Sequence, residues 1–482
     1  MISIQPAPCA YAEDDEPEYH EIVIVGGGIA GLSTAYHLPG RDVLVLEKQP
    51  EVGGRSISGY RDGYWYAKGT EYVGVPYGAL KNIVDGLNMT LLPIVPPMDA
   101  IWTDGKIHYG FSGMLKLLTR KGGLRGLKRF HRLIMNQYAL FEEFQESRQE
   151  GIFSKNKDLQ NLDAMTAAQW MDKNEIPQSY KDKYNVTAMG LFGANLDEIS
   201  ALSLFEEVAF DFEGFDPSEL EDEEGLPIRN GDESAFSFRT GIAEVSKSIA
   251  KHLGPAVRTS STVTSIERNA EGGYTVHYLS GGNEIIVEAD IVVIAVPAPI
   301  AAKIASKVIP EEQSKVVNNI KYAPYVTCAL FFSEPIFTKS FDLAMPPDFF
   351  FTDFYDSTWV QRHKDPKAPK NIYINSAYIA PKSFKDNSIL KLSDTEIVDR
   401  VFKDLEKVFP GSKAKMTGYD IHRFTHAYPV MEPGTLMNLA KLNSQGNGSL
   451  FFAGDWTLYP TFESACDSGR LAAERILEEL ND

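Results

Sequence analysis

The sequence predicts an α/β fold with two domains. A strand, a glycine-rich turn, a helix and a second strand follow one another within residues 21–47, which is the order of a parallel βαβ unit. A further apolar strand at 450–453 ends in Gly-Asp and leads into a C-terminal helix. The stretch 81–235 is mostly helical, whereas short β-rich runs such as 325–332 and 371–377 predict a second sheet.

The first βαβ unit carries the pattern G-x-G-x-x-G between its strand and its helix. Gly26, Gly28 and Gly31 let the backbone turn tightly, approach a pyrophosphate and pack the helix against the sheet. The helix N-terminus offers free N–H groups and a partial positive charge to phosphates. Glu47 ends the second strand, where a carboxylate accepts hydrogen bonds from an adenosine ribose and repels a 2′-phosphate. These residues predict the binding of a dinucleotide other than NADP.

Two later segments extend this site. Gly53-Gly54-Arg55 suits a loop that brings backbone and a guanidinium against phosphate or the edge of a cofactor ring. Asp455, at the end of the C-terminal strand, is placed to bind polyol hydroxyls. The helix that follows begins near Glu463, and its N-terminus is placed to polarise a ring carbonyl.

These motifs together resemble the flavin-containing amine oxidase superfamily, which includes monoamine and polyamine oxidases, L-amino acid oxidases, protoporphyrinogen oxidases and carotenoid desaturases. The resemblance rests on the glycine fingerprint, Gly53-Gly54-Arg55, the segment 69–74 and Ala453-Gly454-Asp455, and it spans nearly the whole chain. It implies a Rossmann-like FAD-binding domain interleaved with a second α+β substrate domain of mixed sheet and helices. The residues that it places at FAD are Gly26, Gly28, Ile29, Ala30, Gly31, Glu47, Lys48, Gly53, Gly54, Arg55, Gly69, Thr70, Glu71, Val263, Gly454, Asp455, Thr461, Phe462 and Ala465.

The chain departs from the superfamily pattern at two positions. Ala67 stands where an acid is usual, two residues before Gly69, and Ser464 replaces the glycine of a usual Glu-Gly-Ala. No cysteine stands just before the C-terminal block, where monoamine oxidases attach their flavin covalently. The resemblance therefore implies non-covalent FAD.

The resemblance also divides the chain into alternating pieces. Residues 1–19 are polar and acidic and are expected to form a flexible lead-in. The FAD-binding domain is expected to take residues 20–80, 236–300 and 415–482, and the substrate-binding domain residues 81–235 and 301–414.

The middle piece of the FAD-binding domain is predicted in more detail. Its pattern indicates a helix at 240–252, a strand at 256–266 that turns back at 271–273, and a strand at 285–296. The resemblance places the backbone of Val263 near the adenine.

Composition excludes several classes of function. The net charge of −19 argues against nucleic acid as a partner, and no apolar run approaches the roughly 18 residues of a membrane span. The three cysteines are too few and too scattered for a disulfide framework or a metal site, so no metal is expected. The resemblance implies a small-molecule substrate, and the oligomeric state stays open.

The N-terminus bears on localisation. Ala10-Tyr11-Ala12 resembles a signal cleavage site, but there is no basic start and no apolar core before it. A cytoplasmic location is therefore expected, with export as the alternative if the true start lies upstream.

The resemblance implies that Lys303 takes part in catalysis. It stands six residues after Pro297, the spacing at which amine oxidases hold a water against flavin N5 with a lysine. An ammonium there would favour the reaction of the reduced cofactor with O2. The alternative is a surface lysine on the helix after the strand, equivalent to Lys307 one turn later.

Aromatic side chains are expected around the substrate. Amine oxidases flank the amine with two rings, one of them just before the Glu-Gly-Ala position, where this chain has Thr461 and Phe462. Tyr428 and Tyr459 are the alternative ring donors. The aromatic run 349–359 either lines the pocket or packs in a core.

Two charged stretches are open to two interpretations. Residues 116–132 form a basic amphipathic segment interrupted by Gly122-Gly123, and they predict either peripheral contact with anionic lipid or two short helices with an exposed basic face. The acidic run 211–224 is either a solvated excursion or a funnel for cationic amines.

The sequence therefore predicts an FAD-dependent oxidoreductase. The preferred reaction is hydride transfer from the carbon next to a neutral amine, with reoxidation by O2 to H2O2. The alternative is a desaturase or dehydrogenase acting on an isoprenoid or another apolar substrate drawn from a membrane. The basic segment and Asp455, where amine oxidases more often have glutamate, support the alternative.

Overall fold

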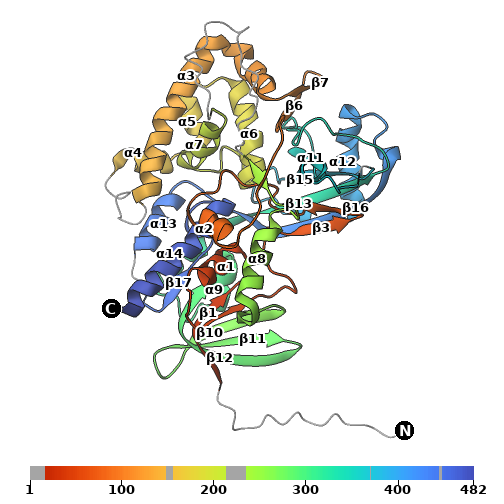
Figure 1. The fold of residues 1–482 in the computed structure, drawn as a ribbon. Coiled ribbons are helices and arrows are strands. Elements are labelled where there is room, and N and C mark those ends of the chain that lie inside the picture. Colours follow the sequence, from red (N-terminus) through yellow and green to blue (C-terminus); the bar gives the residue numbers. More distant parts are fainter. Residues whose placement is uncertain (1–16, 148–155, 213–234, 370, 445–447, 482) are drawn as a thin grey trace, which may run out of the picture.

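The computed structural model describes residues 17–147, 156–212, 235–369, 371–444 and 448–481. They form two sheets and a layer of helices (Figure 1). The first sheet and its helices occupy one end of the molecule, and the helical layer occupies the other. The second sheet lies to one side between them.

The first sheet has seven strands in the order β10-β11-β12-β1-β2-β9, with β17 paired to β12. Its centre is parallel: β1 pairs with β2 on one side and with β12 on the other. Its strands are β1 (Glu18–Val25), β2 (Val43–Leu46), β9 (Val257–Arg258), β10 (Ser261–Arg268), β11 (Tyr274–Ser280), β12 (Asn283–Ile294) and β17 (Leu450–Phe452). The predicted strands in the pieces 20–80, 236–300 and 450–453 thus meet in one sheet.

Both faces of this sheet are buried, because successive side chains along its strands point into two different cores. Val23 and Val25 of β1 face one core, whereas Ile22 and Ile24 face the other, and all four are at most 3% exposed. The second of these cores is closed by helices that pack on the sheet, among which α1 and α14 cross closely. These helices are α1 (Ile29–Tyr36), α2 (Gly78–Gly86), α8 (Ala243–Leu253) and α14 (Phe462–Asn481).

The second sheet has the order β14-β15-β13-β16, and all its pairs are antiparallel. Its strands are β13 (Lys321–Phe332), β14 (Asp353–Asp356), β15 (Tyr373–Ile379) and β16 (Met416–Val430). One face carries Val326, Cys328 and Ile379 and packs on the amphipathic helix α12 (Asp394–Val408). The other face carries Tyr325 and Tyr378 and points away from that core, toward the first sheet.

The helical layer is built from α3 (Phe111–Ser147), α4 (Lys157–Asp163), α5 (Ala167–Lys173), α6 (Gln178–Phe192) and α7 (Ala201–Phe210), at the top of Figure 1. Helices α9 (Ala298–Ile304), α10 (Glu311–Asn319) and α13 (Thr435–Ser444) connect it to the first sheet. The remaining short elements are β3 (Ser58–Arg61), β4 (Tyr64–Ala67), β5 (Leu92–Pro93), β6 (Ala100–Thr103), β7 (Lys106–Tyr109), β8 (Phe236–Ser237) and α11 (Trp359–Lys364).

Two expected boundaries need correction. Strand β1 begins at Glu18, inside the expected lead-in, and Tyr19 donates a hydrogen bond to Asp290. The expected boundary at 415 coincides with the start of β16, which pairs with β13, so residues 416–430 belong to the second sheet rather than to the FAD-binding domain. The stretch 81–235 also contains β5, β6 and β7, because short hairpins carry too few residues to show a clear period.

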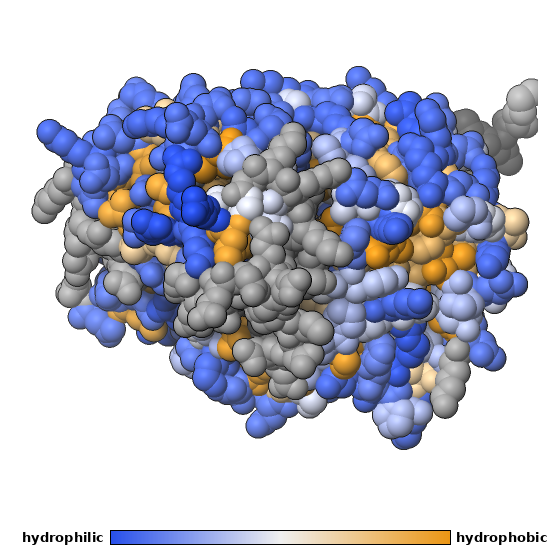
Figure 2. All heavy atoms as spheres, turned by 90° about the horizontal axis from the view of Figure 1, so that it is seen from above, coloured by the Kyte–Doolittle hydropathy of each residue, from blue (hydrophilic) through white to orange (hydrophobic). Residues whose placement is uncertain are grey.

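The basic segment 116–132 lies in α3, which is broken at Gly123 (φ 57°, ψ −171°). The predicted interruption is therefore confirmed, but the part after it continues to Ser147 and is not short. Leu127 and Phe130 are buried, whereas Arg129 is exposed and donates to the carbonyl of Asn174. Figure 2 shows this end of the molecule from above: hydrophilic side chains dominate, and hydrophobic ones lie in separate areas among them. Most of the acidic run 211–224 lies outside the described residues.

Within the described ranges, no helix is both long enough and apolar enough to cross a membrane.

Candidate functional site

A cavity of about 2730 Å³ lies between the two sheets. Single small-molecule pockets usually measure roughly 300–1,000 Å³, so this space can hold a dinucleotide together with a substrate. The first sheet contributes the turn after β1 and the residues that follow β2 and β12. The second sheet contributes the face that carries Tyr325 and Tyr378.

The glycine turn is shaped by close backbone contacts. A Cβ on Gly26 would lie 2.6 Å from the carbonyl oxygen of Ala295, and a Cβ on Gly31 would lie 2.0 Å from that of Gly26. Gly28 instead faces the cavity: a Cβ on Gly28 would meet its nearest atom, the Cα of Gly54, only at 4.0 Å. No side chain caps the N-terminus of α1 at Gly28. The first N–H groups of α1 are therefore available to a phosphate.

Glu47 is held at the end of β2. Its carboxylate accepts hydrogen bonds from the backbone N–H groups of Gly27 and Gln49, both at 2.7 Å. Burial raises the pKa of this carboxyl, while these hydrogen bonds act in the opposite direction. Glu47 lines the cavity, next to Lys48, at the position predicted for ribose binding.

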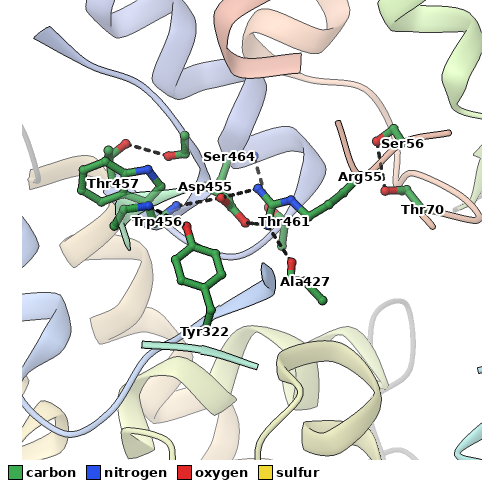
Figure 3. A network of polar contacts seen from close by, with 12 residues as sticks. Arg55, Ser56, Thr70, Tyr322, Ala427, Asp455, Trp456, Thr457, Thr461 and Ser464 are labelled. Carbon is green, nitrogen blue, oxygen red and sulfur yellow. Dashed lines mark hydrogen bonds and ion pairs between the residues drawn. The ribbon is translucent and has the colours of Figure 1, made fainter. Parts of the chain in front are cut away.

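Arg55 and Asp455 form an ion pair across the cavity (Figure 3). The guanidinium reaches both carboxylate oxygens, at 2.6 and 2.8 Å, and it also donates to the carbonyl of Ala427 at 2.7 Å. Burial alone would lower the pKa of Arg55, but the adjacent carboxylate of Asp455 raises it. The pair joins the loop after β2 to the turn after β17, 400 positions apart in the sequence.

The N-terminus of α14 faces the same cavity. Thr461 precedes the helix, and its hydroxyl accepts a hydrogen bond from the N–H of Ser464 at 3.1 Å. Thr461, Phe462 and Ala465 all line the cavity (Figure 3 shows the cap). A helix terminus in this position favours partial negative charge on a bound ring.

The segment from Gly69 to Gly74 lines the cavity on the side of the second sheet. Gly69 lies so close to Arg55 that a Cβ would stand 1.9 Å from the Arg55 carbonyl oxygen. Glu71 accepts a hydrogen bond from the Tyr378 hydroxyl at 2.9 Å, and burial raises the pKa of this carboxyl to about 8. Gly74 donates its N–H to Glu463 at 3.0 Å, which ties the segment to α14.

Tyrosines form the wall of the cavity on the second sheet. The ring of Tyr428, on β16, meets that of Tyr325 at 5.6 Å, and Tyr325 meets Tyr378 at 6.1 Å. Tyr378 in turn meets Tyr355 at 4.9 Å. Burial raises the pKa of Tyr428 to about 12, so its hydroxyl stays protonated at neutral pH. Tyr428 and Tyr355 were candidates from the sequence, whereas Tyr325 and Tyr378 become their neighbours only through strand pairing.

Other aromatic candidates do not reach the cavity. Tyr459 is fully buried and donates its hydroxyl to the carbonyl of Ser203, so it is not a ring donor for substrate. Phe349 and Phe351 pack in the core beneath α12, and Trp359 donates to the carbonyl of Val95 in another core. Of the aromatic run, Tyr355 is the member that lines the cavity, because it alternates with Phe354 along β14.

The two candidate lysines differ in their surroundings. Lys303, on α9, is exposed and lines the cavity. Lys307 lies outside the cavity lining and forms an ion pair with Glu267 at 2.7 Å. The cavity thus has an ammonium at the predicted position, and the role of Lys303 in catalysis stays a prediction.

The predicted cofactor residues are brought together. All of them line the cavity except Gly31, which lies behind the turn against Gly26. The uncapped α1 N-terminus suits a pyrophosphate, Glu47 suits a ribose, and Asp455 with the α14 N-terminus suits a polyol chain and a ring carbonyl. These groups fit FAD. Cys328 and Cys466, the two cysteines within the described ranges, are buried outside the cavity lining.

Known proteins with similar sequence or fold agree with this site. The family model "Flavin containing amine oxidoreductase" matches residues 29–477. The 15-cis-phytoene desaturase of Narcissus pseudonarcissus is 22% identical over 95% of this chain and 80% of its own length.

Among solved structures, a putrescine oxidase bound to putrescine has a TM-score of 0.75 at 19% identity, covering 97% of this chain and all of that chain. The cyclohexylamine oxidase of Brevibacterium oxydans has a TM-score of 0.72 at 21% identity, covering 96% of this chain and all of that chain. The chain therefore belongs to the flavin-containing amine oxidoreductase family and is an FAD-dependent oxidoreductase that holds its cofactor non-covalently.

Proposed function

We propose that this enzyme oxidises an amine and that O2 accepts the electrons. The observation that carries the proposal is the polar tyrosine wall of Tyr325, Tyr378 and Tyr428, with Glu71 hydrogen-bonded to one of them. Aromatic faces attract nitrogen cations, and hydroxyls and carboxylates accept hydrogen bonds from an amine. The hydroxyls of Tyr325 and Tyr378 are held in place by hydrogen bonds to Thr352 and to Gly69 and Glu71, and a hydrocarbon chain would gain no polar contact from them.

Two proteins of similar fold support the same substrate class. The putrescine oxidase and the cyclohexylamine oxidase cover nearly all of this chain, and both act on amines by name. Both share less than 25% identity with it, so the substrate class rests on the cavity rather than on the likeness.

The residues of the chain have distinct parts in this reaction. FAD, held by the glycine turn, Glu47 and the N-terminus of α14, would supply a hydride acceptor for the carbon beside the nitrogen and a route for the electrons to O2, which becomes H2O2. Tyr428 and Tyr325 orient the amine and exclude water from the carbon that reacts. Above its pKa of about 8, Glu71 is ionised and can accept a proton from an arriving ammonium. Lys303 stabilises negative charge where oxygen is reduced.

A desaturase is the second candidate, because the phytoene desaturase resembles the chain along 95% of its length. The exposed arginines of α3 would then contact anionic lipid while the enzyme draws an apolar substrate from a membrane. The polar tyrosine wall of the cavity argues against an apolar substrate and therefore against a desaturase.

The deciding experiment is anaerobic reduction of the purified yellow protein by a panel of amines, amino acids and polyamines, followed at the flavin absorbance band. We expect one amine class to bleach the flavin, and air to restore the colour with release of peroxide. Bleaching by dithionite alone would contradict amine oxidation. In that case apolar polyenes in liposomes containing anionic lipid are tested next, with sedimentation at low salt to measure binding.

A further inference from the structure

The cavity face of the second sheet continues beyond β14 through two segments that the sequence pattern did not predict as strands. Residues 341–344 pair antiparallel with β14, since Phe354 and Asp356 donate to the carbonyls of Leu343 and Phe341. Residues 98–102 pair parallel with 342–344, since Ala100 and Trp102 donate to the carbonyls of Asp342 and Ala344. The sheet thus gains two edge segments beside β14.

These segments bring three carboxyls onto one face. Ala344 lies opposite Asp353 and also opposite Ile101. Because side chains alternate along extended chain, Asp342 and Asp99, two positions before Ala344 and Ile101, share the face of Asp353. All three carboxyls line the cavity, whereas Leu343, which lies between Asp342 and Ala344, is buried in the core on the other face.

The carboxyl group of Asp342 has an incomplete set of hydrogen bonds. Its Oδ1 atom is buried and has no hydrogen-bond partner among the described residues. Burial and the negative charges of Asp353 and Asp99 raise the pKa of Asp342, and burial raises that of Asp353 to about 6. A cation placed between two such carboxyls strongly stabilises their ionised forms.

Aromatic rings surround this position and lead back to the tyrosine wall. Tyr355 follows Asp353 on the same face and meets Phe341 at 5.3 Å, and Phe341 meets Tyr72 at 6.0 Å. Tyr355 also meets Tyr378, which continues through Tyr325 to Tyr428. A continuous path of rings therefore connects the carboxyls with the expected place of oxidation.

We propose that Asp342 and Asp353 bind a second cationic nitrogen, so that the substrate is a diamine or polyamine held at both ends. This inference rests on the proposed amine oxidation. The carbon next to one nitrogen is oxidised beside Tyr428, while the distant ammonium lies between the two carboxyls and over the ring of Tyr355. A bound metal ion does not explain the cluster, because the described residues contain no group of three or more His, Cys, Asp or Glu side chains arranged to hold one.

The test compares α,ω-diaminoalkanes with n-alkylamines of the same carbon number, using the FAD-loaded enzyme and peroxide release. We expect the wild type to prefer diamines, with a maximum of kcat/KM at one chain length. Asp342→Asn and Asp353→Asn should each lower kcat/KM for the best diamine by about tenfold or more, since each removes one charge-assisted contact. Both should leave n-alkylamine oxidation within about twofold of wild type, because only the second nitrogen loses a partner.

Asp348→Asn is the matched control, because Asp348 is exposed, lies on the same connection and does not line the cavity. Asp348→Asn should leave kcat/KM unchanged for both the diamines and the n-alkylamines. The melting temperature and the flavin spectrum verify that each variant folds. Asp342→Asn and Asp353→Asn test the contact with the second nitrogen independently of each other. Equal losses for diamines and monoamines, or a wild-type preference for monoamines, would overturn the inference and leave amine oxidation standing. Oxidation of no amine would overturn both.

Discussion

The two halves of the cavity recognise their ligands by different means. On the side of the first sheet, backbone groups dominate: the uncapped N-terminus of α1, the N–H groups that hold Glu47, and glycines that admit no side chain. On the side of the second sheet, side chains from strands far apart in sequence form the wall. A cofactor site built from backbone groups requires glycines at fixed spacing, which gives a strong local sequence pattern. A substrate site built from side chains sets no such spacing.

The largest effect is expected from a side chain placed in the cofactor half of the cavity, where backbone groups make the contacts. Gly31→Ala puts a Cβ 2.0 Å from the Gly26 carbonyl oxygen, so the turn must shift. Overpacking of this kind costs about 1–3 kcal/mol or more, and we expect FAD occupancy to fall about tenfold or more. The flavin-to-protein absorbance ratio measures it. Gly126→Ala is the control, because its Cβ would meet nothing closer than 4.0 Å. Full occupancy in Gly31→Ala would show that the turn tolerates a side chain.

The second prediction concerns the ion pair that joins the two ends of the chain. Asp455→Asn leaves the guanidinium of Arg55 without its charged partner, and the free energy of unfolding should fall by about 2–3 kcal/mol. Thermal unfolding of the FAD-loaded protein measures this loss. Lys315→Met breaks an exposed pair with Glu312 and should produce no measurable change. Equal stability of both variants would mean that the cavity pair contributes only what a surface pair does.

The third prediction separates the two lysines. Lys303→Met should slow the reoxidation of the reduced enzyme by O2 about tenfold or more, since it removes positive charge from the cavity. Stopped-flow mixing with oxygenated buffer measures the rate. Lys307→Met removes the same charge one turn later, outside the cavity, and should leave the rate unchanged. Unchanged reoxidation in Lys303→Met would exclude the proposed role.

The smallest expected effect concerns pH. Burial raises the pKa of Glu71 from 4.5 to about 8, so between these values the folded state holds a proton that the unfolded state releases. The free energy of unfolding therefore falls as pH rises through this window. Glu71→Gln removes this dependence. Its melting temperature should match that of wild type at about pH 5 and exceed it by about a few degrees at pH 8.5.

Glu271→Gln, on an exposed turn, is the control for this titration and should follow wild type at every pH. A Glu71→Gln protein that melts below wild type at both ends of the range would show that the hydrogen bond from Tyr378 outweighs the cost of burying the charge.

The sequence was sufficient to predict the first half of the cavity and insufficient for the second. Gly26, Gly28 and Glu47 act within one local unit, so their spacing alone identifies them. Asp342 and Asp99 share a face only because residues 98–102 run parallel to 342–344, more than 200 positions away. No local period reveals such a pairing.

The aromatic residues show the same limit at closer range. Phe354 and Tyr355 are neighbours in sequence, but the pleat of β14 sends one into the core and the other into the cavity. The sequence marked the aromatic run without telling these two faces apart. Tyr428 was identified through the resemblance, whereas its partner Tyr325 required the register of β13 against β16.

The position of β17 and α14 has a consequence for synthesis on the ribosome. β17 pairs with β12, and α14 covers α1, yet both are synthesised long after the elements that they contact. Until they emerge, the edge of β12 and the apolar face of α1 remain uncovered on a nascent chain that has already made most of its strands. Folding of the cofactor half therefore has to wait until residues 450–481 have been made, and until then the exposed edge of β12 can pair with other chains.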